Sequence, residues 1–244
     1  MIDWLRPRSA QQDRPLQLEV GRRSLPIAIK RHRTAKRLIL RLAPDGSEIR
    51  VTMPRWGQSA DALEFARSRQ TWLEAQLQGV EEIAPPGPGG DILFCGTPIR
   101  IAWDPAARRK PRLAGSELMV GGPEEGLHGR IERWLRAEGL SAMERDLAHY
   151  CAVAGVPKPK LALSRAQRRW GSCSSSGTVR INWRLIMAPE QVRRSVVAHE
   201  VAHLVHFDHS AAFYALLDDI FEGDMDGANA WLKAKGRSLY SQFG

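Results

Sequence analysis

Four of the seven histidines of this 244-residue chain lie in residues 199–209, which read His-Glu-Val-Ala-His-Leu-Val-His-Phe-Asp-His. His199 and His203 are four positions apart, so on a helix both side chains project from one face and can share a metal ion. Glu200 lies one position round the helix, close enough to reach a water on the metal without being a ligand. The spacing therefore predicts a zinc site at which Glu200 serves as general base in a hydrolysis.

A catalytic zinc usually has three protein ligands and a water, so a third ligand is required. His206 shares the helical face, but it lies about 10 Å along the axis from His199, which is too far if the helix stays straight. His209 follows a predicted break at Phe207–Asp208, so its side chain can turn back from the start of the next helix. A helix N-terminus also disfavours a protonated imidazole. We therefore predict His209 as the third ligand and His206 as a half-buried, hydrogen-bonded neighbour.

The composition excludes several classes of protein. The hydrophobic content of 43% is ample for a packed core, and no run approaches the roughly 18 apolar residues of a membrane helix. The first eight residues contain arginines but no apolar segment follows them, so no signal peptide is predicted. Cys95, Cys151 and Cys173 are odd in number and widely spaced, which argues against a disulfide framework. We expect a cytoplasmic protein that has no membrane association.

The formal net charge of +9 is concentrated in the first half of the chain. Its densest part is Lys30–Arg41, which holds six lysines and arginines and no acid. Such a stretch is typical either of a nucleic-acid surface or of a solvated hairpin face. Because no aromatic residue is interleaved with these cations, we favour the solvated face and expect at most a weak association with nucleic acid.

Two halves with different patterns predict an α+β fold. Residues 1–15 are expected to be a flexible N-terminus, residues 16–122 a β-rich region with one helix, and residues 123–244 a zincin-like domain of helices and a small antiparallel or mixed sheet. No internal repeat is visible in the sequence. In the first part, alternation and turn residues predict strands at 25–30, 37–42, 48–53, 92–95, 98–103 and 117–120, a hairpin turn at 44–46 and a helix from Ser59 or Asp61 to about Gly79.

In the second half, the helix predicted after Pro189 carries the first histidines of the cluster. Its pattern predicts a long helix at about 124–154 with a possible break at Gly139, strands at 160–164 and 178–185, a helix after Pro189, a helix from Asp208 or Ser210 to Phe221, and a last helix at about 227–240. The preceding strands and helix stand in the order that a zincin domain requires.

Three motifs together resemble one known family. They are the segment from Arg169 to Ser174 (Arg-Trp-Gly-Ser-Cys-Ser), the strand segment 177–186, and residues 197–203 with His209 and Ser210. This chain resembles the YgjP-like metallopeptidase family, relatives of the SprT-like minimal zincins, over roughly residues 165–215. The resemblance implies zinc at His199, His203 and His209, Glu200 as catalytic base, and a compact zincin core behind a β-rich N-terminal region.

The metzincins are a competing resemblance, because the spacing from His203 to His209 equals theirs. Their pattern has a glycine where this chain has His206, and that glycine makes a turn that a histidine makes with difficulty. Metzincins are also commonly secreted, whereas no export signal is predicted here. We set this alternative aside.

These observations predict a zinc-dependent metallopeptidase of the HExxH type, which hydrolyses peptide bonds through a zinc-activated water with a glutamate general base. The strand Val179–Leu185 is the expected edge strand for an extended protein or peptide substrate. The oxyanion stabiliser is open among Arg165, Arg169, Arg184 and Tyr214, each of which is equally typical of a structural role.

Two alternatives remain. One is a metal-dependent hydrolase of nucleoside triphosphates, of the pyrophosphatase type, an activity associated with the family that this chain resembles; no glycine-rich phosphate loop supports it. The other is a nucleic-acid-associated protein with a vestigial zinc site. The intact Glu200 argues against this second alternative, because a purely structural site needs no base.

Overall fold

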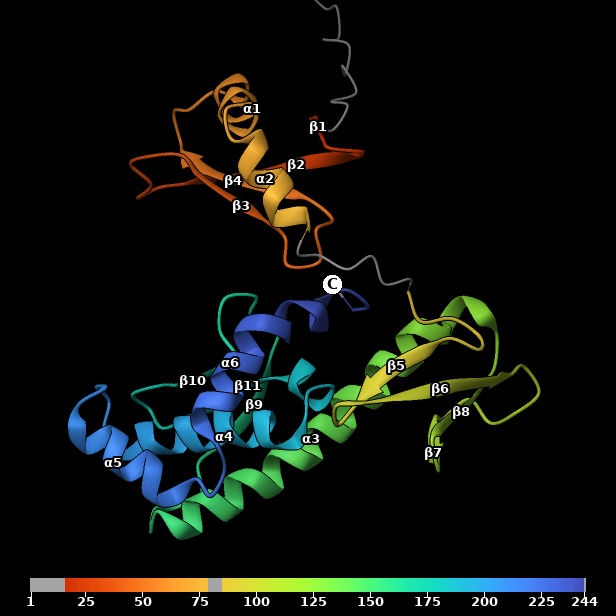
Figure 1. Ribbon diagram of the computed structural model, residues 1–244, viewed down its shortest axis with the longest axis vertical. Coiled ribbons are helices and arrows are strands. Elements are labelled where there is room, and N and C mark those ends of the chain that lie inside the picture. The colour runs from red at the N-terminus through yellow and green to blue at the C-terminus, as the bar shows by residue number, and fades with distance from the viewer. Residues whose placement is uncertain (1–15, 79–84, 244) are drawn as a thin grey trace, which may run out of the picture. The chain divides into compact units, whose positions relative to one another are not determined.

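The computed structural model describes residues 16–78 and 85–243, which divide into two compact units, Met1–Val80 and Glu81–Gly244. Figure 1 shows the sheet and helices of the first unit in red to orange and the second unit in yellow to blue. The segment 1–15, expected to be flexible, lies outside the described residues. No helix in the described ranges is long and apolar enough to span a membrane.

The first unit is a four-stranded sheet with two helices. Its strand order is β1-β2-β4-β3, in which β2 and β4 are parallel and the two outer pairs are antiparallel. The alternation of the sequence buries one face of β2 and β4 against the helices, where Ile49, Val51 and Met53 meet Ala66 and Leu73. The elements are β1 (Gln17–Val20), β2 (Arg23–His32), β3 (Ile39–Leu42), β4 (Ile49–Pro54), α1 (Ser59–Arg67) and α2 (Gln70–Gln78).

The hairpin predicted at residues 44–46 is confirmed between β3 and β4. The amide of Gly46 donates to the carbonyl of Ala43 at 2.9 Å, and Gly46 has φ of 72°, a conformation that glycine adopts without strain. The single helix expected after Ser59 is two helices, because the chain turns at Ser68. The Ser68 hydroxyl donates to the carbonyl of Phe65 at 2.8 Å, which occupies a carbonyl at the end of α1.

The second unit begins with a sheet that repeats the topology of the first. Its order is β5-β6-β8-β7, again with a parallel central pair and antiparallel outer pairs, and again the last strand leads into a helix. No internal repeat is visible in the sequence, because the two sheets share strand order and pairing rather than residue identity. The strands are β5 (Asp91–Phe94), β6 (Thr97–Asp104), β7 (Arg112–Ala114) and β8 (Glu117–Gly121).

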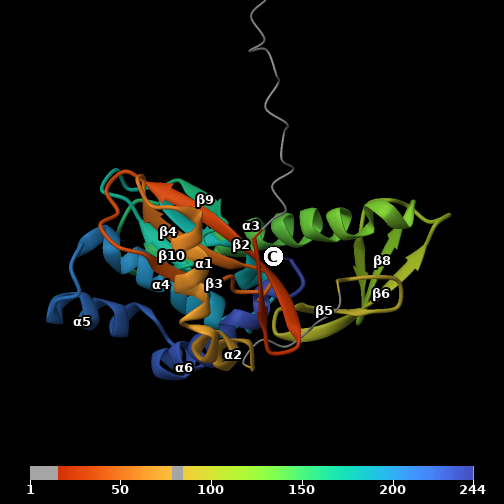
Figure 2. The ribbon, with the colours of Figure 1, turned by 90° about the horizontal axis from the view of Figure 1, so that it is seen from above.

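The remainder of the second unit is mostly helical around a three-stranded sheet of order β10-β11-β9. Figure 2 shows the long helix α3 extending from the sheet of β5, β6 and β8 towards the part that contains β9, β10 and α4. The elements are the 3-10 helix η1 (Glu124–Gly126), α3 (Leu127–Val153), β9 (Leu161–Ser164), β10 (Gly171–Cys173), β11 (Val179–Asn182), η2 (Trp183–Ile186), α4 (Glu190–Val205), α5 (Ala211–Ile220), α6 (Met225–Lys235) and η3 (Gly236–Tyr240).

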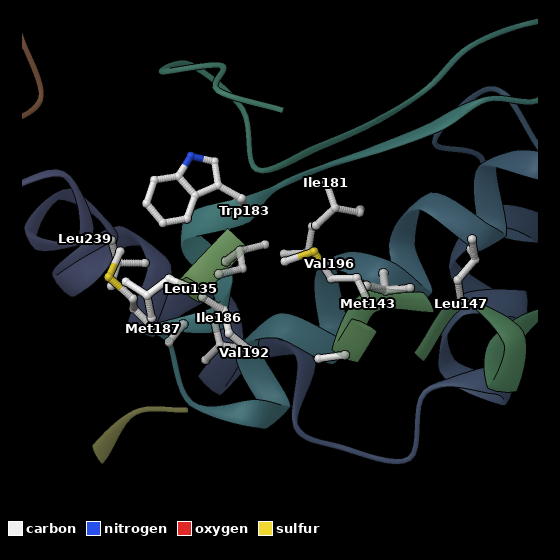
Figure 3. Packing of buried hydrophobic residues seen from close by; sticks show 14 of the residues in the cluster. Leu135, Met143, Leu147, Ile181, Trp183, Ile186, Met187, Val192, Val196 and Leu239 are labelled. Atoms are coloured by element: carbon white, nitrogen blue, oxygen red, sulfur yellow. The ribbon is translucent and has the colours of Figure 1, made fainter. Parts of the chain in front are cut away.

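Helix α3 connects both sheets of the second unit into one core. It is continuous through Gly139, where the predicted break is absent and where a Cβ atom would lie 3.4 Å from the Ile186 side chain. The core packs side chains of α3 such as Leu135 and Met143 against Trp183 and Ile186 (Figure 3). Because Ile92, Ile99, Ile101, Leu118 and Val120 belong to the same core, the boundary expected at residue 122 lies inside this unit. The mixed architecture confirms the α+β fold class.

Candidate metal centre

Helix α4 carries the first two histidines of the candidate metal centre, and burial of most of its surface fixes its position. Pro189, which has no amide hydrogen to leave unsatisfied, precedes it as the N-cap. Val192, Val197 and Val201 are buried, so the helix cannot rotate without exposing them. His199 and His203 consequently project from a fixed, half-buried face of α4.

The structure brings His199, His203 and His209 together and leaves His206 outside the cluster. Each of the three offers a ring nitrogen, and these nitrogens all lie within 4.8 Å of one another. The two Nε2 atoms of His199 and His209 are 3.4 Å apart. Two nitrogens of a tetrahedral zinc site with bonds of about 2.0–2.1 Å are separated by about 3.4 Å. The three imidazoles therefore fit a zinc ion, although metal binding itself stays a prediction.

The turn between α4 and α5 explains how His209 reaches the cluster. Helix α4 ends at Val205, and His206 adopts an extended backbone as its C-cap. The carbonyl of His206 accepts a hydrogen bond from Nδ1 of His203 at 3.0 Å. This bond places the proton on Nδ1 and leaves Nε2 free to bind a metal. His209 then lies just before Ser210, whose hydroxyl caps α5 by accepting from the amide of Phe213 at 3.4 Å.

Phe213 is a part of the site that the sequence did not indicate. Its ring is fully buried and lies 5.0, 4.6 and 4.9 Å, centroid to centroid, from the rings of His199, His203 and His209. The four-residue spacing from His209 to Phe213 on the next helix was the signal available in the sequence. One aromatic side chain thus packs against all three imidazoles and restricts their orientations.

Burial sets the protonation state of His199. Desolvation is the main cause that lowers the pKa of His199 to about 4, and the neighbouring imidazoles of His203 and His209 lower it further. A neutral imidazole is the form that ligates a metal, so His199 requires no deprotonation at neutral pH.

Glu200 is buried beside the histidines in an environment unlike that of a surface carboxylate. Its exposed fraction is 5%, and its Oε2 atom has no hydrogen-bond partner among the described residues. Burial raises the pKa of Glu200 to about 7, against the opposing influence of the Cys173 backbone amide and the charge of Arg169. A carboxyl with a pKa near 7 is well suited to accept and return a proton at neutral pH.

Gly171 on β10 provides the space for that carboxyl. A Cβ atom at this position would lie 2.7 Å from Cδ and from Cγ of Glu200, and closer still to Oε1. Real Cβ atoms do not approach carbon so closely, so the Glu200 side chain occupies the volume that a side chain at 171 would fill. The sequence contained Gly171 within the Trp-Gly-Ser-Cys motif, but only the fold reveals its contact with Glu200.

The predicted edge strand was wrong. Strand β11 lies in the centre of its sheet, because β10 pairs with one of its edges and β9 pairs in parallel with the other. Strand β10 is an edge strand instead. Its neighbours Trp170 and Ser174 make the backbone hydrogen bonds to β11, so the alternation of a strand turns the backbone groups of Gly171 and Cys173 to the free edge.

The four candidate oxyanion stabilisers occupy different surroundings. Arg184 is buried and packs over the rings of Trp183 and Tyr240, which indicates a structural role. Arg165 is exposed and donates to Glu132 at 2.6 Å. Arg169 influences the pKa of Glu200, so it lies within electrostatic reach of the site. Tyr214 has its ring centroid 6.2 Å from that of His209.

Beside the histidines is an acidic cavity of about 600 Å³. His199, His209 and Tyr214 line it on one side, and α5 and the start of α6 complete its wall. Three aspartates are among its lining residues, namely Asp218, Asp224 and Asp226, and the Asp224 carboxylate also caps α6 by accepting from the Gly227 amide at 2.9 Å. This grouping was not predictable from local sequence patterns, since its residues come from both α5 and the start of α6.

The family model described as "YgjP-like, metallopeptidase domain" matches residues 36–235. No curated protein matches the chain. Among solved structures, the metallopeptidase zymogen of Pyrococcus abyssi abylysin is similar with 21% identity and a TM-score of 0.35, over 42% of this chain and 99% of that chain.

Proposed function

This chain belongs to the YgjP-like metallopeptidase family, and on that premise we propose that it is a zinc-dependent peptidase with His199, His203 and His209 as ligands and Glu200 as general base. One observation carries the proposal. Three imidazole nitrogens lie within 4.8 Å of one another beside a carboxyl that is 5% exposed. Imidazole donors in this number suit a catalytic zinc, which keeps its fourth position for water or substrate.

The proposed chemistry divides between the ion and Glu200. A bound zinc supplies Lewis acidity, which lowers the pKa of water to about 7 and polarises a carbonyl. Glu200 accepts the proton of the attacking water and returns it to the nitrogen of the leaving amine, for which a pKa of about 7 is favourable. Its carboxyl is held in place by the Gly171 backbone and by the Cys173 amide.

We propose that the free edge of β10 binds the peptide backbone. The outward backbone groups of Gly171 lie next to the Glu200 side chain, to which the Cys173 amide already bonds, so a substrate strand paired at Gly171 would run beside the base. Tyr214 and Arg169 are the two remaining candidates to stabilise the oxyanion, because one contacts His209 and the other acts on Glu200.

A nucleoside triphosphate is a poorer substrate for this site than a peptide. The cavity beside His199 and His209 is lined by Asp218, Asp224 and Asp226. Like charges repel, so three carboxylates disfavour the approach of a polyphosphate. The same carboxylates favour substrates with neutral or basic side chains.

The thiols of Cys95, Cys151 and Cys173 are unpaired in the described residues, which supports our proposal of a reducing, cytoplasmic location. The exposed cations among residues 30–41 also support a second partner, nucleic acid, which would bind the first unit rather than the metal centre.

The test compares the Glu200→Gln variant with the unaltered protein in metal content and in hydrolysis. Glutamine retains the shape of the side chain but cannot accept the proton. We expect about one zinc per chain in both proteins, and a loss of casein hydrolysis of about 10²–10⁴-fold in the variant. A phosphate-release assay with nucleoside triphosphates runs in parallel. Full activity of Glu200→Gln, or triphosphate hydrolysis without peptide hydrolysis, would overturn the proposal.

A further inference from the structure

An exposed basic surface of the first unit lies where β2 and β4 end together. These strands are parallel and paired in register, with Arg31 opposite Met53 and His32 opposite Pro54. Neighbouring strands are about 4.8 Å apart, so the chains that leave them emerge side by side. One continues through Arg33 into the loop between β2 and β3, and the other continues through Arg55 towards α1 (Figure 1).

The turn after β4 displays a tryptophan at this place. The amide of Gly57 donates to the carbonyl of Pro54 at 3.2 Å, which makes Arg55 and Trp56 the two central residues of a β-turn. Pro54 and Gly57 are buried, whereas the side chain of Trp56 is 81% exposed. Its ring has no aromatic or cation–π partner within the described ranges. The buried residues at the two ends of the turn thus hold a large aromatic ring in solvent.

Cations from another segment lie at the same end of the sheet as this turn, because β2 ends beside β4. Arg31 donates to the Ser59 hydroxyl at 3.0 Å, which fixes the end of β2 against the first residue of α1. Five cationic residues are exposed at the end of β2 and in the loop that follows it, namely Lys30, Arg31, Arg33, Lys36 and Arg37. In the described part of the chain, none of them has a carboxylate oxygen within 4.0 Å. Their charge is therefore available to a ligand.

The repeated sheet of the second unit gives an independent observation. Its loop between β6 and β7 holds the topological position of the loop between β2 and β3, and it too is basic. Arg108, Arg109 and Lys110 are exposed there and also have no carboxylate oxygen within 4.0 Å among the described residues. Two loops of different sequence thus present cations without carboxylate partners at equivalent positions. A loop that is merely solvated has no need of a particular charge, so the shared charge favours a role in binding.

We propose that the surface formed by the loop between β2 and β3 and by Trp56 binds single-stranded nucleic acid. Arginine and lysine side chains bind phosphates, and an exposed aromatic ring stacks on an unpaired base. A duplex offers phosphates but keeps its bases stacked, so the tryptophan favours a single strand. The absence of interleaved aromatics in the sequence argued against such a surface, and the pairing of β2 with β4 removes that objection. This inference does not depend on peptidase activity.

Fluorescence anisotropy of labelled oligothymidylate and oligouridylate with the full-length protein tests it, and the two probes distinguish DNA from RNA. Trp56→Ala is expected to weaken binding at least about 5-fold, the loss of one stacked base. Trp56→Phe should restore most of the affinity. Trp72→Ala is the matched control, because Trp72 is also exposed, at 43%, on the same unit but lies on α2.

The charge contribution has a separate readout. Replacing Arg33, Lys36 and Arg37 by alanine should lower the slope of log K against log salt by about 2, since each phosphate contact to a single strand contributes about 0.7. Casein hydrolysis should be unchanged in every variant. The proposal fails if Trp56→Ala binds as the unaltered protein does, or if duplex and single strand bind equally.

Discussion

Gly171→Ala is the sharpest test of how the fold positions Glu200. The added Cβ atom would lie 2.7 Å from both Cγ and Cδ of the Glu200 side chain. Favourable carbon–carbon contacts begin at about 3.5 Å, so the carboxyl must withdraw by about 0.8 Å or β10 must move by as much. Both elements are packed, because α4 is buried along Val197 and Val201 and β10 pairs with β11.

The displacement sets the expected magnitude. A shift of about 1 Å in a catalytic group costs on the order of 10²-fold in rate, so kcat should fall about 100-fold, equivalent to about 2.7 kcal/mol in the activation free energy. The free energy of unfolding should fall by about 1–3 kcal/mol, the usual effect of overpacking. Metal content should not change, because the three atoms nearest to the added Cβ all belong to Glu200 and none to His199, His203 or His209.

The assay is steady-state hydrolysis of labelled casein, together with zinc analysis and thermal unfolding. Gly129→Ala serves as control, because a Cβ atom on this half-buried glycine of α3 would meet only the Arg133 guanidinium, at 3.4 Å. If Gly171→Ala is folded and metal-loaded and keeps the kcat of the unaltered protein, Glu200 is not the base or does not require its observed position.

Three further predictions concern the metal and the core. His209→Ala should lower zinc affinity by at least about 10-fold in a competition titration. His206→Ala should keep the metal, because His206 is outside the ligand group and alanine retains the backbone carbonyl that bonds to His203; equal losses would contradict the assignment. Removal of the metal by a chelator should lower Tm, and zinc at about 100 times its Kd should restore about 2.7 kcal/mol; no change in Tm would refute binding to the folded state. Arg193→Ala should destabilise the protein by about 3–5 kcal/mol in denaturant unfolding, because it leaves Asp146 buried without the 2.7 Å ion pair, while Arg136→Ala at an exposed pair should cost under about 1 kcal/mol; similar losses in both would show that burial is not the cause.

Much of the fold was predictable from local patterns. The alternation in β2, β4 and β6 and the turn at Gly46 depend on neighbours in the sequence, so their positions were confirmed within a few residues. The order of strands in each sheet was not predictable. Pairing of β2 with β4, or of β11 with β9, joins segments that are separated by other elements, and no local pattern specifies such a partner.

The two four-stranded sheets show the same limit on what local sequence patterns can predict. Each copy has its own loop lengths and its own side chains, so the repeat is invisible in residue identities and evident in topology. Trp56 illustrates the consequence. It lies fifteen positions after Arg41 in the chain, yet strand pairing places it beside the cations that precede β3.

The sequence alone sufficed to predict the candidate metal ligands. The four-residue spacing of His199 and His203 on a helix, and the helix break before His209, depend only on local geometry, and they sufficed to identify the three residues that the structure brings together. Only the tertiary structure decided the pKa of Glu200 and the space that its carboxyl occupies. The pKa of Glu200 rises to about 7 because distant segments bury it, and Gly171 must be a glycine because β10 packs against α4. Desolvation and close packing arise from residues that are far apart in the chain, so they become visible only after it has folded.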